Sequence, residues 1–542
     1  MQKIGGSRRL VRSVGVGVLF GSLLLGFGAM ASNADELPTP TDSATTPSTP
    51  TDSATTPSTP TDSATTPSTG DKGSLPQATI MSTPAGAPYG SSYPVTLETD
   101  FSRPYKAISS VANSDFSLLN DLERLIKGSY WDPRTNKERP WAERKANHVY
   151  LSISRMENSH RVGRELVKAA KAGVKVRVIH GKASQSKESR ALERSLNSSK
   201  LRDAHFKICQ KGKSLACLSN LPSAIMHSKI LLIGNTFTRD KEPAKSAIWS
   251  GSANLGGPSG ERTYNNGLTV YNDKKLWEQT SDMWADMYAE RNVGNNYLHY
   301  IAAHDGNGRY GYTGAKADGY TSDYASNGMF YSNLSKVTIY ATPIQATPTN
   351  GKDPVLNLLN RVVPDDQCHI RLQENRFKYR RIAVAQKLVQ LADDGCDIAA
   401  VSFQDDLAVN RAAHCQQYIR ICRPILDVLK TASRHIDVGW AKPHDKTILV
   451  DAKLKSNPLN REEVVVVDGT TYGRTASGSV HLWPSSGIRE QLVLAGSAAL
   501  TGSNLVVSDE ITTETTDASV YDDYLQHWKA IEKSRNFRNY PY

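Results

Sequence analysis

Apolar and polar positions along the chain predict a strand, a helix and a second strand in close succession after residue 147. The helix spans residues 162 to 172, with Leu166, Val167 and Ala170 on one face. Gly173 ends it, because glycine readily adopts the backbone conformation that closes a helix. The alternating apolar positions of the two strands are Val149, Leu151, Ile153, Val174, Val176 and Val178.

The same succession returns in the second half of the chain. A helix is predicted over Ile382 to Asp393, and Gly395 ends it. When Gly173 and Gly395 are aligned, Leu166 falls on Leu388, so the two helices present the same apolar face. The apolar strand residues here are Cys368, Ile370 and Leu372 before the helix and Ile398 to Val401 after it.

Each half then contains an apolar, β-branched run that suits a buried strand, with a His-x-Lys motif directly before it. The motif is His227 and Lys229 in the first half, and His444 and Lys446 in the second. Both halves close with a helix in which a Trp follows an Asp by 11 residues. We therefore predict an α/β protein that contains one β-α-β-rich unit twice. The closing pairs are Asp273 with Trp284 and Asp517 with Trp528.

Residues 1–31 have the features of a signal peptide. Basic residues precede an apolar stretch, which ends at the small-x-small site Ala29-Met30-Ala31. The sequence TPTDSATTPS then occurs three times between Thr39 and Ser68, with almost no side chains that could form a core. We expect a disordered linker over residues 32–80 of a secreted protein. Whether this linker also crosses a cell wall is left open.

The rest of the chain divides into two halves and a link. We expect a first half over residues 81–300, a link over 301–335 and a second half over 336–542. The second half carries an insertion over 452–490 that has no counterpart in the first. Because it leaves the motif strand directly, it is expected to cover the site or line its mouth.

Charge and cysteine content narrow the partners and the compartment. Lys and Arg total 65 against 54 Asp and Glu, which gives a net charge of +11 and favours nucleic acid, an anionic membrane or a phosphorylated substrate. Six cysteines in an exported chain predict disulfides. No Cys-x-x-Cys pair occurs, so no metal site is expected. Among several possible connectivities, short loops favour Cys209–Cys217 and Cys415–Cys422, which leaves Cys368–Cys396.

Paired His-x-Lys strands suit phosphoryl chemistry. A phosphodiester repels nucleophiles through its charged oxygens, and two ammonium groups can offset that charge. One imidazole can attack phosphorus while the other protonates the leaving oxygen, so no cofactor is required. We interpret the basic run from Arg376 to Arg381 as a solvated segment that leads into a helix, rather than as a binding site for phosphate or lipid.

A Gly-Ser sequence with a nearby Asn follows each motif strand, at Gly251-Ser252-Ala253-Asn254 and at Gly502-Ser503-Asn504. With the paired motifs, this order resembles the phospholipase D superfamily over residues 145 to 535. The resemblance implies a duplicated α/β/α sandwich with two pseudo-twofold-related halves and the active site between them. It also implies a phosphohistidine intermediate. The phosphate would be held by Lys229, Lys446, Ser252, Asn254, Ser503 and Asn504.

The resemblance further implies that one histidine is the nucleophile, for which we take His227, and that the other is the acid/base. Each would need an acceptor on its second ring nitrogen. The first motif departs from the family because Gly234 stands where the second has Asp451, which the family counts among its catalytic residues. A missing essential carboxylate would disable the first half, whereas a packing carboxylate would cost stability only. The candidate acceptors are Asp509, Glu510, Asn265 and Asn266.

Three functions are consistent with these residues. The first is a secreted phospholipase D-like hydrolase, acting as a monomer on phosphatidylcholine-type lipid at a membrane surface and transferring the phosphatidyl group to water or another alcohol. The second is a secreted nuclease with the same site. The third is a non-catalytic phospholipid-binding relative, which Gly234 makes plausible. Two halves in one chain favour the first.

Overall fold

The computed structural model divides the chain into a unit of residues 1–33 and a unit of residues 34–542, and every described residue belongs to the second. The predicted signal peptide and repeat linker lie outside the described residues. The described residues are 92–104, 114–157, 161–182, 185–210, 214–219, 224–290, 329–344, 346, 351–403, 420–457, 464–467, 470–474, 480–484, 486–534 and 537–539.

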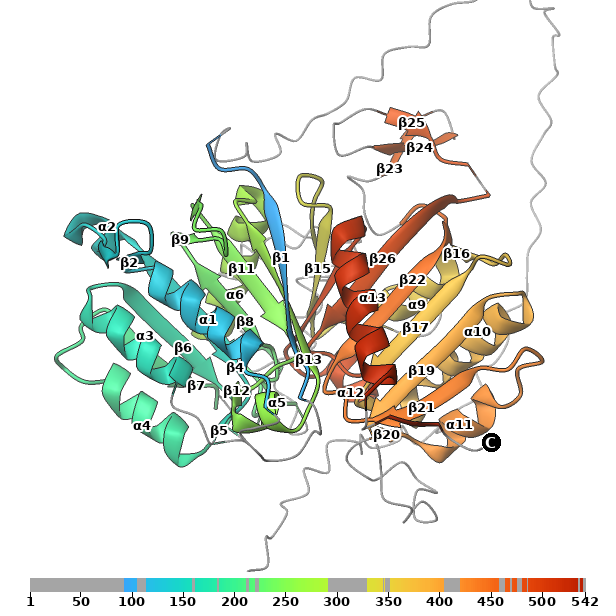
Figure 1. Cartoon of the computed structure of the whole chain (residues 1–542), viewed down its shortest axis with the longest axis horizontal. Coiled ribbons are helices and arrows are strands. Elements are labelled where there is room, and N and C mark those ends of the chain that lie inside the picture. Colours follow the sequence, from blue (N-terminus) through green and yellow to red (C-terminus); the bar gives the residue numbers. More distant parts are fainter. Residues whose placement is uncertain are drawn as a thin grey trace, which may run out of the picture. The chain divides into compact units, whose positions relative to one another are not determined.

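The first half is built on a seven-stranded sheet with helices on its faces (Figure 1). In spatial order, its strands are β1 (Thr96–Ser102), β13 (Asn265–Tyr271), β11 (Ala247–Gly251), β8 (Ile230–Ile233), β4 (His148–Ile153), β6 (Lys175–His180) and β7 (Ala204–Ile208). Its helices are α1 (Ser117–Gly128), α2 (Trp141–Ala146), α3 (Arg161–Lys171), α4 (Lys187–Leu196), α5 (Gly257–Glu261) and α6 (Lys274–Ala289).

The second half repeats this plan in a ten-stranded sheet. Its main path is β14 (Met329–Ser332), β15 (Val337–Thr342), β27 (Glu510–Thr515), β26 (Ile488–Gly496), β22 (Lys446–Leu454), β17 (His369–Glu374), β19 (Asp397–Phe403), β21 (Asp437–Ala441) and β28 (Arg538–Asn539), and β16 (Val362–Val363) pairs with β22. Its helices are α9 (Pro354–Arg361), α10 (Ile382–Asp393), α11 (Arg423–Leu429), α12 (Gly502–Val506) and α13 (Ala518–Glu532), and Tyr379–Arg381 form the 3-10 helix η4.

Strand directions and register agree between the two sheets. The motif strands β8 and β22 each lie antiparallel between two neighbours, β11 and β4 in one sheet and β26 and β17 in the other. The next two steps, β4 to β6 and β17 to β19, are parallel, as the strand–helix–strand pattern predicted. The predicted helices correspond to α3 and α10, and Gly173 and Gly395 follow them with φ of 96° and 117°.

Helices α6 and α13 join the cores of the two halves. Trp277 and Trp284 of α6 share a buried cluster with Phe330 and Ile339 of the second sheet. Tyr524 and Trp528 of α13 share another with Tyr264 and Leu268 of the first half and with Leu449 of β22. Burial of aromatic side chains from both halves in common clusters stabilises their association.

Short strand pairs and a small sheet complete the fold. The insertion contains the strands β23, β24 and β25, which form a sheet of their own. The insertion leaves β22 where this strand ends, at Leu454. Since the histidine stands at the other end of β22, the insertion leaves the sheet at the end away from the motif, and whether it covers the site stays a prediction. The short strands are β2 (Trp131–Asp132), β3 (Lys137–Glu138), β5 (Met156–Glu157), β9 (Thr236–Phe237), β10 (Pro243–Ala244), β12 (Leu255–Gly256), β18 (Arg376–Phe377), β20 (Arg420–Ile421), β23 (Val464–Val467), β24 (Thr470–Arg474) and β25 (Val480–Leu482).

The expected link between the halves and the expected disulfides can be compared with the structure. Strand β14, within the expected link, pairs with β15 in the second sheet. The disulfides Cys209–Cys217 and Cys368–Cys396 are present. Cys422 is also disulfide-bonded, whereas Cys415 lies outside the described residues. None of the described helices has the length and apolar character of a membrane span.

Candidate active site

The two His-x-Lys motifs stand at the same place in their sheets. Lys229 directly precedes β8, and Lys446 is the first residue of β22. Each ammonium group donates to the backbone oxygen of the histidine of its own motif, at 2.6 Å for Lys229 and His227. Both lysines are buried, with exposed fractions of 0% and 3%. Two buried cations therefore lie at the ends of matching strands.

Each histidine is tied by its backbone to the opposite half of the chain. The N–H of His227 donates to the oxygen of Asp509 at 3.0 Å, and the N–H of His444 donates to the oxygen of Tyr264 at 2.8 Å. Isolated parallel bridges join Met226 to Asp509 and Tyr264 to Pro443. The two contacts are reciprocal, so the motif of one half is positioned by the segment before β13 or β27 of the other.

The ring of His227 meets a carboxylate from the second half. Its Nδ1 lies 2.8 Å from Oε1 and 2.9 Å from Oε2 of Glu510, so Nδ1 donates to the carboxylate. Ser497 also donates its hydroxyl to Glu510, and Asn504 donates its side-chain amide. Since Glu510 is a fixed acceptor, Nε2 of His227 is left as the nitrogen with a free lone pair.

The ring of His444 meets an amide from the first half. Its Nδ1 lies 2.9 Å from Oδ1 of Asn265. The Asn265 nitrogen donates to the backbone oxygens of Ser259 and Thr263 at 2.9 and 3.0 Å, which fixes Oδ1 toward the ring. Because Oδ1 only accepts, His444 must carry its proton on Nδ1. The two rings thus share one tautomer but differ in the charge of the acceptor.

In the second half, the serine that corresponds to Ser252 is Ser497, which the sequence analysis did not predict. Ser252 exchanges backbone and side-chain hydrogen bonds with Asn266 and donates to Asn265, and Ser497 makes the same set with Ile511 and Glu510. Both serines precede their acceptor by 13 residues, a spacing that would have identified Ser497. Its local sequence, Gly496-Ser497-Ala498-Ala499-Leu500, has Ala499 in the place of Asn254.

Ser503 and Asn504, the predicted phosphate ligands, instead begin helix α12. Thr501 caps this helix, and its hydroxyl lies 3.2 Å from the Ser503 hydroxyl. Asn504 supports Glu510 from behind. In the first half, Asn254 is half-buried and its Oδ1 has no hydrogen-bond partner within the described residues. Of the four amide and hydroxyl ligands expected from sequence, the structure therefore places Ser252 and Asn254 after β11, beside the Lys229 end of β8.

Two of the four candidate acceptors have other partners. The carboxylate of Asp509 accepts the backbone N–H groups of Cys217 and Leu218 at 2.5 and 3.2 Å, so it anchors the loop closed by the Cys209–Cys217 disulfide. The Asn266 amide donates to Asp445 at 2.8 Å and to Thr447 at 3.0 Å. Glu510 and Asn265 are thus the acceptors of the histidine rings.

The third residue of the second motif lies away from the histidines. Asp451 follows Lys446 by five residues, roughly 16 Å along a strand at about 3.3 Å per residue. Its carboxylate accepts from Arg489 at 2.8 Å and Gln491 at 3.2 Å. A side chain at Gly234 would meet His148, whose Cε1 lies 2.7 Å from the position of an added Cβ. The replacement of Asp by glycine therefore removes no group from the site.

Burial shifts the ionisation of the central groups. Burial, followed by the charge of Lys229, lowers the pKa of His227 well below 6.5, and burial with the nearby Lys446 does the same to the pKa of His444. Burial lowers the pKa of Lys446 to about 8, against the raising effect of Glu374 and the other carboxylates. Burial also raises the pKa of Glu510 to about 7, which Lys229 opposes. Both imidazoles are therefore neutral near pH 7, the form needed for attack.

Two arginines complete the positive field. Arg155 and Arg376 each stand two residues beyond the end of a matching strand, β4 or β17, and are followed by residues that pair with Leu255 and Leu500. The charge of Arg376 lowers the pKa of both histidines, and that of Arg155 lowers the pKa of His227. The charge of Arg376 therefore reaches both histidines. The sequence could have indicated this residue, because Arg155 and Arg376 stand at the same position after matching strands of the two halves.

The second half carries an additional carboxylate beside its lysine. Glu374 of β17 lies opposite Lys446 in the strand register, and burial raises its pKa well above 4.5 while Lys446 opposes the shift. A cavity of about 40 Å³ touches Glu374, Lys446 and Ala499. The described residues contain no group of three or more His, Cys, Asp or Glu side chains that could hold a metal ion.

Comparison with known proteins identifies a domain in the first half of the chain. Residues 144–287 match the family model described as cardiolipin synthase, PLD-like domain. No curated protein matches the chain. Among solved structures, a phosphatidylserine synthase from Haemophilus influenzae is 9% identical, covering 83% of this chain and 89% of its own, with a TM-score of 0.44.

Two further structures are similar to parts of the chain. A polyphosphate kinase from Porphyromonas gingivalis is 12% identical over 80% of this chain and 49% of its own length, with a TM-score of 0.40. Nuc, a phospholipase D family member from Salmonella typhimurium, is 14% identical over 36% of this chain and 95% of its own, with a TM-score of 0.24. The family match therefore shows a PLD-like domain over residues 144–287, and the second half of the chain adds a second His-x-Lys strand whose histidine contacts that domain.

Proposed function

We propose that the protein is a secreted phosphodiesterase that cleaves the head group from phosphatidylcholine-type phospholipid, forming phosphatidate and an alcohol. The observation that carries this proposal is the reciprocal pairing of the two histidines. Each ring is oriented by an acceptor from the other half, His227 by Glu510 and His444 by Asn265. The charges of both lysines and the His227 ring lower the pKa of His444, which supports the proposal that these groups surround one phosphate.

In the first step, Nε2 of His227 attacks phosphorus and the bond from phosphorus to the head-group oxygen breaks. The leaving oxygen takes a proton from Nε2 of His444, which has to gain that proton when the anionic substrate offsets the lysine charges. The Glu510 carboxylate stabilises the positive charge that develops on the His227 ring. His444 has only an amide partner, so its imidazolium is the stronger acid, which suits protonation of a leaving group.

In the second step, His444 removes a proton from water, whose oxygen attacks phosphorus as the bond to His227 breaks. The products are phosphatidate and the free imidazole. If an alcohol takes the place of water, the phosphatidyl group is transferred to it. Lys229 and Lys446, with Arg155 and Arg376 nearby, offset the charge on the phosphoryl oxygens in both steps.

The substrate class is supported by the arrangement of the chain. Both halves of the site are supplied by one chain, which agrees with the lipid enzymes of the superfamily more than with its small nucleases. The two disulfides are compatible with an oxidising, extracellular compartment. The positive field of the site suits a negatively charged phosphate ester. It also suits the product, because phosphatidate carries more negative charge than the diester from which it forms.

The test compares His227→Ala and His444→Ala with the wild-type protein. On phosphatidylcholine vesicles in the presence of a chelator, both variants should release choline at least about 10²-fold more slowly, the low end of a general acid/base contribution. On an ester with a nitrophenolate leaving group, which needs no protonation, His444→Ala should still give a burst of nitrophenolate, whereas His227→Ala should give none. A burst in both variants would reject His227 as the nucleophile.

The alternatives give different results in the same experiments. Degradation of an oligonucleotide in chelator, without choline release, would identify a nuclease. Binding to vesicles with no turnover of either substrate would identify a non-catalytic relative. Thermal unfolding of both variants close to that of the wild type would show that lost turnover does not come from lost folding.

A further inference from the structure

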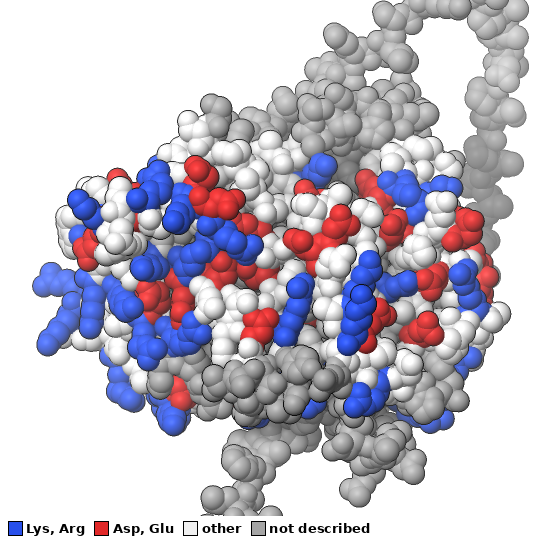
Figure 2. All heavy atoms as spheres, viewed as in Figure 1, with Lys and Arg blue, Asp and Glu red and all other residues white. Residues whose placement is uncertain are grey.

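We propose that helices α3 and α4 form a docking surface for a bilayer that contains anionic phospholipid. Residues 161–202 contain twelve Lys and Arg against three Glu, a formal charge of +9 compared with +11 for the whole chain. Figure 2 shows Lys and Arg gathered at the end of the molecule where Figure 1 places these helices, and a more even mixture of charges elsewhere on this face. Almost the entire charge excess of the protein thus belongs to one short segment.

Nine of the twelve cations of this segment are exposed, whereas two of its three carboxylates are buried and the third, Glu193, is partly exposed. Glu165 is buried, where it accepts from Tyr130 and from Lys168, and Glu188 is buried in the first turn of α4. No acidic residue of the segment is exposed among its described residues. The exposed cations are Arg164, Lys168, Lys171, Lys182, Lys187, Arg190, Arg194, Lys200 and Arg202.

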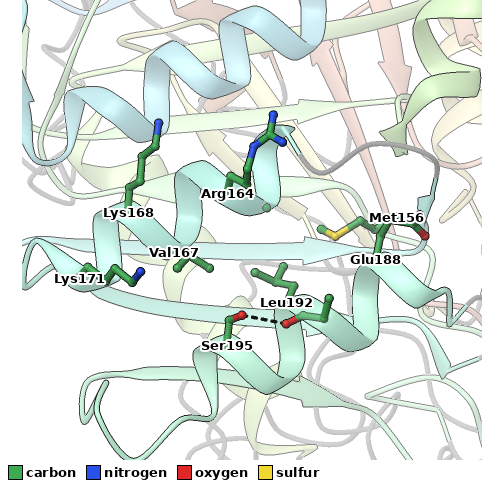
Figure 3. Close-up of a pocket in the computed structure, with 10 residues that line it drawn as sticks. Met156, Arg164, Val167, Lys168, Lys171, Glu188, Leu192 and Ser195 are labelled. Carbon is green, nitrogen blue, oxygen red and sulfur yellow. Dashed lines mark hydrogen bonds between the residues drawn. The ribbon is translucent and has the colours of Figure 1, made fainter.

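A groove of about 310 Å³ lies between the two helices, and its floor is apolar. Val167 of α3 and Leu192 of α4 lie in it, while Arg164 and Lys168 extend from another edge of α3 (Figure 3). Lys171 lines its far end, and Glu188 also contributes to the lining. Apolar side chains between long cationic ones suit an amphiphile with an anionic head, since the head meets the cations and the acyl chain meets the floor.

A lipid surface fits this face better than a nucleic acid. Residues 161–202 contain no Phe, Tyr or Trp on which bases could stack, and the apolar floor offers nothing to a phosphodiester backbone. One lining residue of the groove is also the sequence neighbour of a residue near the candidate site. Met156 forms one end of the groove, directly after Arg155, which lowers the pKa of His227. This docking role rests on the proposed function only for its purpose, which is to hold the site against its substrate.

The test measures sedimentation with vesicles of phosphatidylcholine alone and with phosphatidylglycerol added. The triple variant Arg164→Gln, Lys168→Gln, Lys171→Gln removes three exposed cations and keeps long side chains. A basic residue near an anionic surface contributes about 1 kcal/mol, so binding to the anionic vesicles should fall roughly 100-fold at low salt. Binding to phosphatidylcholine alone should change little. The matched control is Lys430→Gln, Lys529→Gln, Lys533→Gln, three exposed cations of the second half, and should keep wild-type binding.

The proposal is wrong if the triple variant binds anionic vesicles as the wild type does, or if the control loses as much. It is also wrong if the triple variant loses binding to a DNA duplex but keeps binding to the vesicles, because the face would then serve a nucleic acid. Thermal unfolding checks the folding of each variant. Sedimentation requires no turnover, so a protein without phosphodiesterase activity can still pass this test, and an active one can still fail it.

Discussion

The two histidines differ in the chemistry of their partners, a carboxylate for His227 and an amide for His444, and that difference supports the roles proposed for them. Glu510 and Asn265 occupy matching positions, each accepting from Nδ1 of a ring and from a serine hydroxyl. A carboxylate favours the positive ring that forms when His227 is phosphorylated, whereas an amide leaves the His444 imidazolium more acidic. The amide in the first half is therefore a functional asymmetry rather than a lost residue.

The rate should depend on pH through Glu510 and Lys446. Glu510, with a pKa raised to about 7, has to be ionised to support His227, so activity should rise with pH through 7. Lys446, with a pKa lowered to about 8, has to be protonated to hold phosphate, so activity should fall above 8. A pH profile of kcat/KM on a soluble diester should be bell-shaped and narrow.

Glu510→Gln gives the control for this profile. It keeps the hydrogen bond to His227 and removes the charge, so activity should drop on the order of 10²-fold and the acidic limb should disappear while the basic limb remains. An acidic limb that survives in Glu510→Gln would mean that another group, such as Asp509 with its pKa raised to about 7, controls it.

At the scale of strands and helices, local patterns predicted most of the fold. Helix α10 has the bounds expected from its apolar face and Gly395, and the strand that follows each motif is present. These elements are encoded by residues close in sequence, so periodicity is sufficient. The edge strand β1 was not predicted, because it pairs with β13, whose residues lie far along the chain. Strand β14 pairs with the next strand, β15, across a short turn, and its polar, Gly-rich surroundings concealed it.

The same distinction explains the errors at the site. The insertion makes the distance in sequence from Lys446 to Ser497 longer than that from Lys229 to Ser252. The sequence therefore favoured the nearby Gly502-Ser503, which has the expected Gly-Ser pattern. The choice among the four acceptors could not be made from sequence, because each ring pairs with the opposite half. Only a contact across the two sheets distinguishes Glu510 from its neighbour Asp509, whose carboxylate turns to the loop at Cys217.

The strand register also predicts what happens if the first motif is completed. In Gly234→Asp, the new side chain would meet His148 and Asn147, with an added Cβ 2.7 Å from the nearest ring atom. Overpacking of this kind typically costs 1–3 kcal/mol. Urea unfolding should therefore show a loss of stability of about 1–3 kcal/mol. Turnover measured on the folded protein should not increase.

Asp451→Asn is the companion variant at the matching position. Its ion pair with Arg489 is partly exposed, so its loss should cost no more than about 1 kcal/mol, and kcat should stay within about twofold of the wild type. A loss of activity as large as that of His444→Ala, without unfolding, would return Asp451 to the catalytic group.

At the scale of the whole molecule, the site exists only where the halves meet. Ser250 and Thr513 share a hydrogen bond of 2.8 Å between β11 and β27, and the buried clusters around α6 and α13 draw residues from both halves. Neither half contains both a histidine and the acceptor that orients it. The association of the halves is therefore a condition for the proposed catalysis, and one chain supplies it.

This arrangement predicts the result of mixing two inactive proteins. In His227→Ala, the single site of each chain lacks the nucleophile, and in His444→Ala it lacks the acid. Because both histidines of a site come from the same chain, a mixture of the variants should be as inactive on phosphatidylcholine as either alone, and wild-type activity should be proportional to protein concentration. If the halves instead exchanged between two chains, unfolding the mixture in urea and refolding it would create sites with both histidines intact. Recovered choline release after refolding, absent from each variant refolded alone, would show that the working site is shared between chains.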